Sequence, residues 1–388
     1  MPGVEALPNW LADIFGDGKS KVPCNRGNIS MAYDVDRNNP LGEGSFGRVC
    51  RARHLVSRTK FAVKEASKKR ADGKLSSPED VGGLRHEMDV MQTLDHPNIV
   101  KVIETYEDAS NFWLVLELCE GGRVDDFVAQ IGQFTEKDAS HIMKQVLGAT
   151  AYMHNRSICH RDLKPQNLLF QSRSPIESNT VKVADFGLAC ACPQGRELRD
   201  KVGSVEYMAP QVLEKRYDLA ADLWSCGAVL YLLLCGYPPF QNDSEERLMA
   251  TIRRGNYVLK TEDWSAISED AKYLVRGLLK MNANERLTAD QACGQLWVRH
   301  GASSSTQLKV AIRNLRTRPS FKRRQQGTDA AGAYTSVLGK FRANEWVGPV
   351  VNWATNTLPN VFEFQCSSDT ATRSDEHLME IRPLDEVR

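Results

Sequence analysis

Apolar positions follow two different spacings in two successive parts of the chain. Between about residues 33 and 118 they alternate with polar positions or form short runs, which is typical of β-strands. One helical stretch, Leu84–Leu94, interrupts this part and places Leu84, Met88 and Met91 on one face. The predicted strands are Arg48–Arg53, Lys60–Lys64, Val100–Tyr106 and Phe112–Leu116.

From about residue 121 to residue 298, apolar residues recur instead at intervals of three and four, which predicts amphipathic helices. The clearest are Glu136–His154, Ala220–Leu234, Ser244–Arg254 and Ser268–Leu279. A strand-rich lobe with one helix, followed by a larger helical lobe, is an α+β arrangement. We expect an active cleft between the two lobes.

The composition of residues 1–32 and of the residues after 298 differs from that of these two parts. The predicted organisation is a flexible leader (1–32), an N-terminal lobe (33–118), a C-terminal lobe (119–298), a basic amphipathic linker (299–328) and a C-terminal extension of undefined role (329–388). We find no internal repeat.

Charge and composition narrow the class of protein. The chain of 388 residues has 50 Lys and Arg against 49 Asp and Glu, a formal net charge of +1, which argues against nucleic acid as the main partner. Its 41% hydrophobic and 26% charged residues are typical of a globular protein. The most apolar stretch, Cys226–Phe240, contains Gly and two prolines, so we expect a buried helix and a loop there, and no membrane anchor.

The N-terminus lacks the basic start and long apolar run of a secretory signal. Ten cysteines lie among apolar segments without paired spacing, as expected for reduced, buried thiols. We therefore expect a cytoplasmic protein, with the nucleus as the alternative.

A glycine-rich segment, Gly42–Val49, lies between two strand-like runs. Because it does not open a helix, it argues against a dinucleotide-binding turn. A glycine hairpin allows backbone N–H groups to close over triphosphate oxygens. The nucleotide contacts predicted in it are Gly42, Glu43, Gly44, Ser45, Phe46, Gly47 and Val49.

Three further segments complete a set of phosphate-handling residues. Lys64 ends an apolar strand and is placed to reach phosphates, and Glu87 on the predicted helix could pair with it, although a surface glutamate is the alternative. Asn167 and Asp185, from His160–Asn167 and Asp185–Gly187, offer the hard oxygen ligands that suit Mg²⁺. Asp162 is then left to orient a hydroxyl and accept its proton.

Each motif alone is weak, but together and in this order they resemble the protein kinase family over roughly Tyr33–Val298. The chain looks most similar to the calcium- and calmodulin-regulated group, particularly calcium-dependent kinases of plants and protists. Further matching strings are Leu94–Val100, Glu117–Gly122, Cys235–Phe240, Trp264–Ser268 and Asn284–Ala289. The resemblance implies a bilobal kinase fold, ATP with Mg²⁺, and proteins with Ser or Thr as substrates.

The resemblance also assigns roles to individual residues. It implies a catalytic base at Asp162 assisted by Lys164, with Lys64 and Glu87 holding the phosphates, and Lys164 indicates Ser or Thr substrates. Asp222 would anchor the backbone of the catalytic loop. The implied adenine pocket consists of Leu41, Val49, Ala62 and Leu169, with Leu116 at its back and a hinge from Glu117 to Cys119.

Two departures concern the activation segment. Gln211 stands where the family has Glu, so its pairing with Arg286 should be weaker but not lost. Residues 188–202 contain no Ser, Thr or Tyr, so Arg161 has no phosphate to meet there. We expect Glu197 or Asp200 to supply that negative charge permanently; the alternative is that both are simply solvated.

A third departure concerns substrates. Members of the group that prefer an upstream arginine use acids at positions that here are Arg123, Gln166 and Leu232. Asp125 and Asp126 could compensate, but like charge at Arg123 would oppose an arginine. An arginine-directed enzyme is therefore not assumed.

The C-terminal part contains a second possible site of control. Residues 301–328 carry seven basic residues and no acids, resembling an autoinhibitory or calmodulin-binding segment, although Pro319 would break the helix and a solvated linker is the alternative. Residues 329–388 have nine acids, five basic residues and scattered aromatics, but no EF-hand loop, so direct calcium control is not expected. The sequence therefore predicts an active Ser/Thr kinase, with a calmodulin-gated kinase and a pseudokinase scaffold as alternatives.

Overall fold

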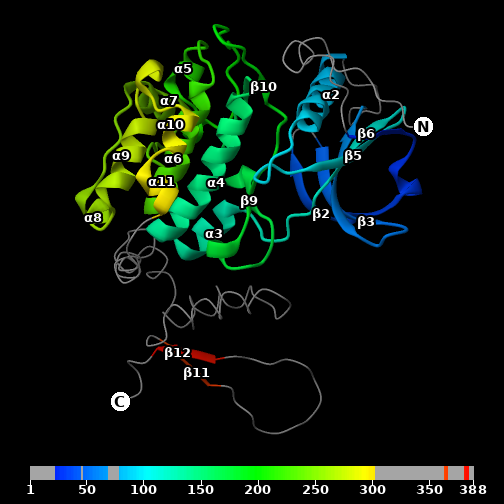
Figure 1. The fold of residues 1–388 in the computed structure, drawn as a ribbon, viewed down its shortest axis with the longest axis horizontal. Coiled ribbons are helices and arrows are strands. Elements are labelled where there is room, and N and C mark those ends of the chain that lie inside the picture. Colours follow the sequence, from blue (N-terminus) through cyan, green and yellow to red (C-terminus); the bar gives the residue numbers. More distant parts are fainter. Residues whose placement is uncertain (1–21, 45–46, 69–77, 302–361, 366–379, 384–388) are drawn as a thin grey trace. The chain divides into compact units, whose positions relative to one another are not determined.

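The computed structural model describes residues 22–44, 47–68, 78–301, 362–365 and 380–383 (Figure 1). These residues belong to two compact units. The larger unit holds the described residues up to residue 301, except 173–178. In the smaller unit, strand β11 (Phe362–Gln365) pairs antiparallel with β12 (Glu380–Pro383).

The N-terminal, or small, lobe of the larger unit is built on one six-stranded sheet, in the order β1-β5-β6-β4-β3-β2. Its neighbours pair antiparallel except β1 and β5, which are parallel. Helix α2 (Pro78–Thr93) lies beside the sheet (Figure 1). The strands are β1 (Cys24–Arg26), β2 (Tyr33–Gly44), β3 (Gly47–His54), β4 (Lys60–Ser67), β5 (Val102–Glu107) and β6 (Asn111–Leu116).

The structure corrects the predicted end of the leader at residue 32. Strand β1 pairs with β5, and the short 3₁₀ helix η1 (Ile29–Met31) follows it. Ile29 is completely buried in an apolar cluster with Trp113 and Val115. Residues 24–31 thus belong to the sheet and core of the small lobe, because an apolar side chain and a strand edge both find partners there. Residues 1–21 lie outside the described residues.

Helices form most of the C-terminal, or large, lobe. Helix α6 runs through its centre, and every residue from Ala221 to Cys235 is buried. The helices are α3 (Val124–Ile131), α4 (Glu136–His154), α5 (Pro210–Leu213), α6 (Ala220–Cys235), α7 (Glu245–Arg254), α8 (Thr261–Trp264), α9 (Glu269–Leu278), α10 (Ala289–Cys293) and α11 (Leu296–His300). The predicted α+β arrangement of two lobes is confirmed.

One buried acid ties helices of the large lobe together. The carboxylate of Glu136, at the start of α4, accepts the Ser268 backbone N–H at 3.0 Å and the Trp297 indole N–H at 2.8 Å. These bonds connect α4 to the beginning of α9 and to α11. They also satisfy a charge that would be costly to bury without partners.

Short elements shape the region between the lobes. Strand β8 (Leu168–Phe170) pairs with β9 (Val181–Val183), and β7 (Ile158–Cys159) pairs with β10 (Cys190–Ala191). The larger unit also contains the short helices η2 (Pro165–Asn167), η4 (Val205–Tyr207) and η5 (Ala283–Glu285), while η3 (Ile176–Ser178) belongs to the smaller unit.

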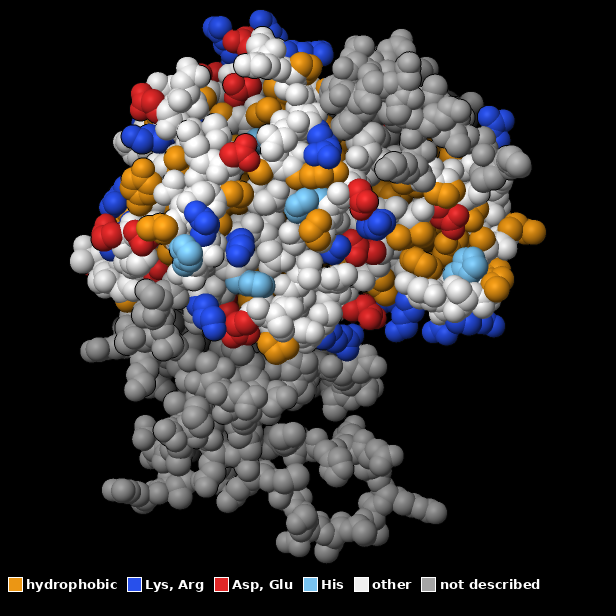
Figure 2. Space-filling view, in the orientation of Figure 1, with side chains coloured by type: hydrophobic (Ala, Val, Ile, Leu, Met, Phe, Trp, Pro, Cys, Tyr) orange, Lys and Arg blue, Asp and Glu red, His pale blue; other side chains and the backbone are white. Residues whose placement is uncertain are grey.

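The surface fits the balanced charge of the chain. On the face shown in Figure 2, acidic and basic side chains are interspersed over the large lobe, and hydrophobic side chains gather on the small lobe. Exposed Met31 and Val56 belong to the small lobe. Among the described helices, none combines the length and the hydropathy needed to cross a membrane.

Candidate active site

An ion-paired lysine lies where the two lobes meet. Lys64 on β4 donates to the carboxylate of Glu87 on α2, and its Nζ lies 3.3 Å from Asp185 Oδ1. Burial opposes the charge on Lys64, but the carboxylates of Glu87 and Asp185 outweigh it and raise the pKa of Lys64. Burial opposes the charge of Asp185 in turn, yet Lys64 lowers the pKa of that carboxyl. An ionised lysine and an ionised aspartate therefore lie in contact where the two lobes meet.

A second polar cluster surrounds Asp162. Its Oδ2 lies 2.8 Å from Lys164 Nζ, and its Oδ1 accepts the Ser204 backbone N–H at 3.0 Å and the Ser204 hydroxyl at 2.9 Å. Lys164 also donates to Ser204 Oγ at 2.8 Å. Asn167 Nδ2 donates to the Asp162 backbone carbonyl at 2.9 Å. The carboxylate thus has a single fixed orientation.

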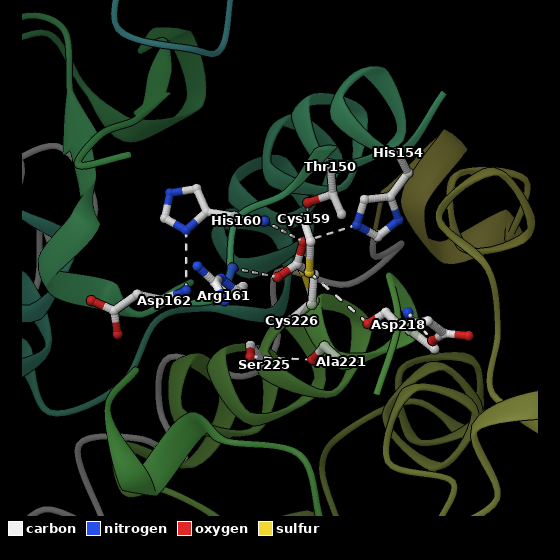
Figure 3. A network of polar contacts seen from close by, with 12 residues as sticks. Thr150, His154, Cys159, His160, Arg161, Asp162, Asp218, Ala221, Ser225 and Cys226 are labelled. Atoms are coloured by element: carbon white, nitrogen blue, oxygen red, sulfur yellow. Dashed lines mark hydrogen bonds and ion pairs between the residues drawn. The ribbon is translucent and has the colours of Figure 1, made fainter. Parts of the chain in front are cut away.

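A buried acid, Asp222 on α6, holds the loop that carries Asp162. Figure 3 shows the residues of this loop, His160, Arg161 and Asp162. Asp222 Oδ2 accepts the His160 backbone N–H at 2.8 Å and His154 Nε2 at 2.9 Å, and its Oδ1 accepts the Arg161 backbone N–H at 2.9 Å. Arg161 adopts φ 69°, a conformation that side-chain-bearing residues rarely take. These three bonds offset the cost of that backbone conformation.

The loop is linked in turn to the segment around Asp185. His160 Nε2 lies 3.2 Å from the Ala184 carbonyl, and its ring packs against Phe186, which is completely buried. Asp185 itself has φ 61°. His86 Nε2 on α2 lies 2.8 Å from the Ala189 carbonyl, a link between the small lobe and this segment that the sequence analysis did not find.

Arg161 points into the following segment and meets an acid there. It donates to the Leu188 carbonyl at 2.5 Å and to Asp200 Oδ2 at 3.0 Å. Glu197 instead pairs with Arg216 at 2.6 Å. Of the two acids considered from the sequence, the structure therefore brings Asp200 to Arg161.

Gly203 is required where this segment passes the loop that carries Asp162. Its φ is +106°, and a Cβ added there would lie 2.4 Å from the Arg161 carbonyl oxygen. A larger residue would push Ser204 away from Asp162.

The glycine-rich segment forms the hairpin between β2 and β3. Gly42 pairs with Val49, and Gly44 pairs with Gly47. Gly47 has φ +128°, and a Cβ there would collide with the Glu65 carbonyl at 2.1 Å. Ser45 and Phe46 lie outside the described residues, as does the side chain of Glu43.

The residues predicted for the adenine pocket come from both lobes. Val49 and Ala62 lie on adjacent small-lobe strands, and Ala62 is paired with Leu116. Leu169 belongs to β8 in the large lobe, and Leu41 on β2 is 39% exposed. The sheet pairing therefore brings the small-lobe members together.

The predicted hinge is fixed by a network that the sequence analysis missed. Glu117 Oε1 accepts the Lys101 backbone N–H at 2.8 Å and lies 2.7 Å from Lys182 Nζ on β9. The carboxylate is therefore engaged by the protein itself, and only the backbone of Glu117 is a candidate for nucleotide contact. Burial raises the pKa of the Cys119 thiol to about 12.

The predicted partner of Arg286 is also present. Arg286, 3% exposed, donates through Nη2 to Gln211 Oε1 at 2.9 Å, and Gln211 Nε2 donates to the Met281 carbonyl at 2.6 Å. Burial lowers the pKa of Arg286 to about 10. The guanidinium has hydrogen-bond acceptors but no carboxylate at Gln211.

Most of this chain matches a known family and known proteins. A family model described as "Protein kinase domain" matches residues 35–298. Calcium-dependent protein kinase 3 of Plasmodium berghei (strain Anka) is 39% identical over 272 residues, covering 70% of this chain and 47% of that protein. Calcium-dependent protein kinase 5 of Plasmodium falciparum is 36% identical over 284 residues, covering 73% and 48%. The chain thus spans about half the length of these relatives.

A shorter relative has a different name. Calcium/calmodulin-dependent protein kinase type 1 of Macrobrachium nipponense is 39% identical over 275 residues, which cover 70% of this chain and 77% of that protein.

The Arg286 contact gives a stability prediction. Gln211→Glu places a carboxylate beside the buried guanidinium of Arg286. The stabilisation from this ion pair should exceed the loss of the hydrogen bond from Gln211 to the Met281 carbonyl. We expect the melting temperature to rise by about 2–4 °C, the shift that ~1 kcal/mol gives in a domain of this size. Calorimetry would measure it, with Gln241→Glu at an exposed position as the control. An unchanged or lowered melting temperature for Gln211→Glu would contradict this account.

Proposed function

We propose that this chain, which belongs to the protein kinase family, transfers the γ-phosphate of ATP to serine and threonine hydroxyls of proteins. Its resemblance to the calcium-dependent and calmodulin-dependent kinases is confirmed by the comparisons. One observation carries the proposed activity: the Lys64–Glu87–Asp185 cluster and the Asp162–Lys164 pair lie in a single unit, joined by the bond from His160 to Ala184.

Asp162 is proposed as the base. Its carboxylate is held by Asn167 Nδ2 at 3.2 Å and by the Ser204 backbone N–H at 3.0 Å, so a substrate hydroxyl arriving there would meet a carboxylate already in place. As the hydroxyl oxygen attacks the γ-phosphorus, its proton passes to Asp162 and ADP leaves. Lys164, 2.8 Å from the carboxylate, is placed to stabilise the transferred phosphoryl group.

Lys64 and two oxygen ligands are proposed to hold the triphosphate. Lys64 is kept charged and aimed by Glu87. Because Asn167 donates through Nδ2 to Asp162, its oxygen is left available as a ligand, and Lys64 keeps Asp185 ionised. Asn167 and Asp185 are therefore a donor set that fits Mg²⁺. A bound Mg²⁺ would neutralise charge on the phosphate oxygens.

The nucleotide base is proposed to lie between the two lobes. Leu41, Val49, Ala62 and Leu169 would supply its apolar walls, and the backbone from Glu117 to Cys119 its polar contacts. The hairpin of Gly42 and Gly47 would cover the phosphates, since its glycines leave the backbone accessible.

The preference for Ser and Thr rests on Lys164 and on the relatives' names. Lys164 already bridges Asp162 to a serine hydroxyl, that of Ser204. This contact shows the distance at which an aliphatic hydroxyl can approach the proposed base.

Phosphorylation of the activation segment is proposed to be unnecessary. Residues 188–202 offer no hydroxyl, and Asp200 already gives Arg161 a negative partner at 3.0 Å. The permanent carboxylate would hold the segment in the arrangement that keeps Ser204 beside Asp162.

Calmodulin gating is the second candidate, favoured by the basic residues of 301–328 and by the name of the Macrobrachium relative. Residues 302–328 lie outside the described residues. The pseudokinase alternative has less support, because Lys64, Glu87, Asp162, Asn167 and Asp185 are all present. Lys64 contacts Glu87 and Asp185, and Asn167 contacts Asp162.

The activity is tested with Mg²⁺, labelled ATP and a degenerate Ser/Thr peptide array. Wild-type protein should transfer phosphate, and Asp162→Asn should lower kcat by about 10²–10⁴-fold, the usual contribution of a positioned base. ATP binding by the variant would serve as the folding control. Equal activity of both proteins would overturn the proposal. Transfer only after addition of calcium and calmodulin would favour the gated candidate.

The role of Asp200 is tested by a matched pair of acids. Asp200→Asn should lower kcat by about two- to fivefold, because an ion pair whose carboxylate is 71% exposed contributes at most ~1 kcal/mol. Glu197→Gln should leave kcat unchanged. Asp200→Glu, which keeps a carboxylate at this position, should have a kcat close to that of the wild type. Loss of activity after phosphatase treatment of the wild type would show that a phosphate is required, and would contradict the proposal.

A further inference from the structure

Strand β2 bulges just before the glycine-rich hairpin. The register of its pairing with β3 shifts between Asp36 and Pro40, because β2 advances there by four residues while β3 advances by one. Residues 37–39 are therefore extra residues of β2 that lie out of register with β3. A bulge of this kind redirects its strand. It thus determines where the next two residues, Leu41 and Gly42, enter the proposed nucleotide site.

Polar contacts fix the shape of the bulge. Asp36 Oδ1 accepts the backbone N–H groups of Asn38 at 3.2 Å and of Asn39 at 3.3 Å. On the neighbouring strand, Arg48 Nη1 donates to the backbone carbonyl of Arg37 at 3.3 Å. Side chains thus replace the β-ladder as hydrogen-bond partners of these backbone groups.

An ion pair ties the bulge to β4. Arg37 Nε donates to Glu65 Oε2 at 3.0 Å, and Arg37 Nη2 donates to Glu65 Oε1 at 3.4 Å. Because β3 lies between β2 and β4 in the sheet, the arginine side chain reaches across β3. Glu65 Oε1 also accepts the indole N–H of the buried Trp113, on β6, at 3.1 Å. The interior of the small lobe therefore orients Glu65, and Glu65 in turn orients Arg37.

Glu65 also supports the second strand of the hairpin. Gly47, the first residue of β3, passes so close to the Glu65 backbone that an added Cβ would lie 2.1 Å from its carbonyl oxygen. Glu65 follows Lys64 on β4, and successive side chains of a strand face opposite sides of a sheet. Val49 is the register partner of Lys64 and shares its face. Glu65 thus contacts both strands of the hairpin from behind the face that carries Lys64 and Val49.

We propose that Arg37 and Glu65 are positioning residues that hold the glycine-rich hairpin in place over the nucleotide. This inference rests on the proposed kinase function and adds to its nucleotide site two residues that do not touch the nucleotide. Without their ion pair, the bulge and the residues after it would move more freely, while the Lys64–Glu87 pair would remain. Nucleotide binding should therefore weaken, and phosphoryl transfer from the bound nucleotide should proceed as before.

The affinity for Mg-ATP tests this proposal in two single variants. Arg37→Gln and Glu65→Gln each remove the ion pair, and Glu65→Gln keeps a side-chain oxygen for Trp113. Because the two side chains are 40% and 21% exposed, the effect should be modest. We expect the Kd of Mg-ATP, by calorimetry, and the KM for ATP to rise about two- to fivefold, with kcat and the KM for peptide unchanged. A pair that only stabilised the fold would lower the melting temperature without changing the Kd, and that result would overturn the proposal.

Three further variants separate the ion pair from general effects of charge. The double variant Arg37→Gln with Glu65→Gln should bind Mg-ATP as weakly as either single variant, and multiplied effects would contradict a shared role. Arg53→Gln, at an exposed position of β3, should match the wild type. Arg37→Lys, which keeps the charge, should give an intermediate Kd even if the Gln variants fail to fold; a wild-type Kd there would count against the proposal.

Failure of this inference is distinguishable from failure of the proposed function. Unchanged Kd values in both single variants of an active kinase would refute the role of the ion pair alone. A wild type that neither bound Mg-ATP nor phosphorylated any member of the peptide array would refute both.

Discussion

The arrangement of the cleft depends on one buried carboxylate. Asp222 is completely buried, and its burial would be prohibitive without partners. It has three, the backbone N–H groups of His160 and Arg161 and the ring of His154. Burial opposes its charge, yet the bond from His154 and the other donors keep its pKa low. The charge and the strained loop therefore stabilise each other, and neither would persist alone.

The contacts of the cleft extend from this anchor in three directions. His160 bonds the carbonyl before Asp185 and thereby reaches the ion pair of Lys64. Arg161 reaches Leu188 and Asp200 in the activation segment. The residue after Arg161 is the proposed base, Asp162. The rigidity required for phosphoryl transfer, which relies mainly on positioning, thus comes from a helix in the interior of the large lobe.

The parts of the fold and of the site that depend on local sequence pattern could be predicted from the sequence. The bounds of α4 agree with the prediction, because its apolar period is clear and Thr135 caps it. The ion pair of Lys64 with Glu87 was considered from the sequence, with a surface glutamate as the alternative, and the structure contains the pair. Local sequence pattern did not predict the structure where contacts between distant residues determine it. Nothing near Ile29 signals that its partners, Trp113 and Val115, lie more than eighty residues away. The choice of Asp200 over Glu197 likewise depends on how the segment folds back to Arg161.

The helix α3 and the strand β2 show the same limit in different ways. Pro40 and two asparagines interrupt β2, whose range was not among the predicted strands, and its pairing with β3 continues through register shifts. Arg123 was recognised from sequence as an opposing charge at the substrate site. Its pairing with both Asp125 and Asp126 required the geometry of the first turn of α3.

The most direct test of this account is the kcat of Asp222→Asn, measured with its KM for ATP. An asparagine cannot accept both backbone N–H groups and His154 with a full charge, so the loop carrying Asp162 should lose its fixed position. We expect kcat to fall about 100-fold, as small misplacements of catalytic groups do, while the KM for ATP changes little. A folded Asp222→Asn protein that retained wild-type kcat would contradict the central claim.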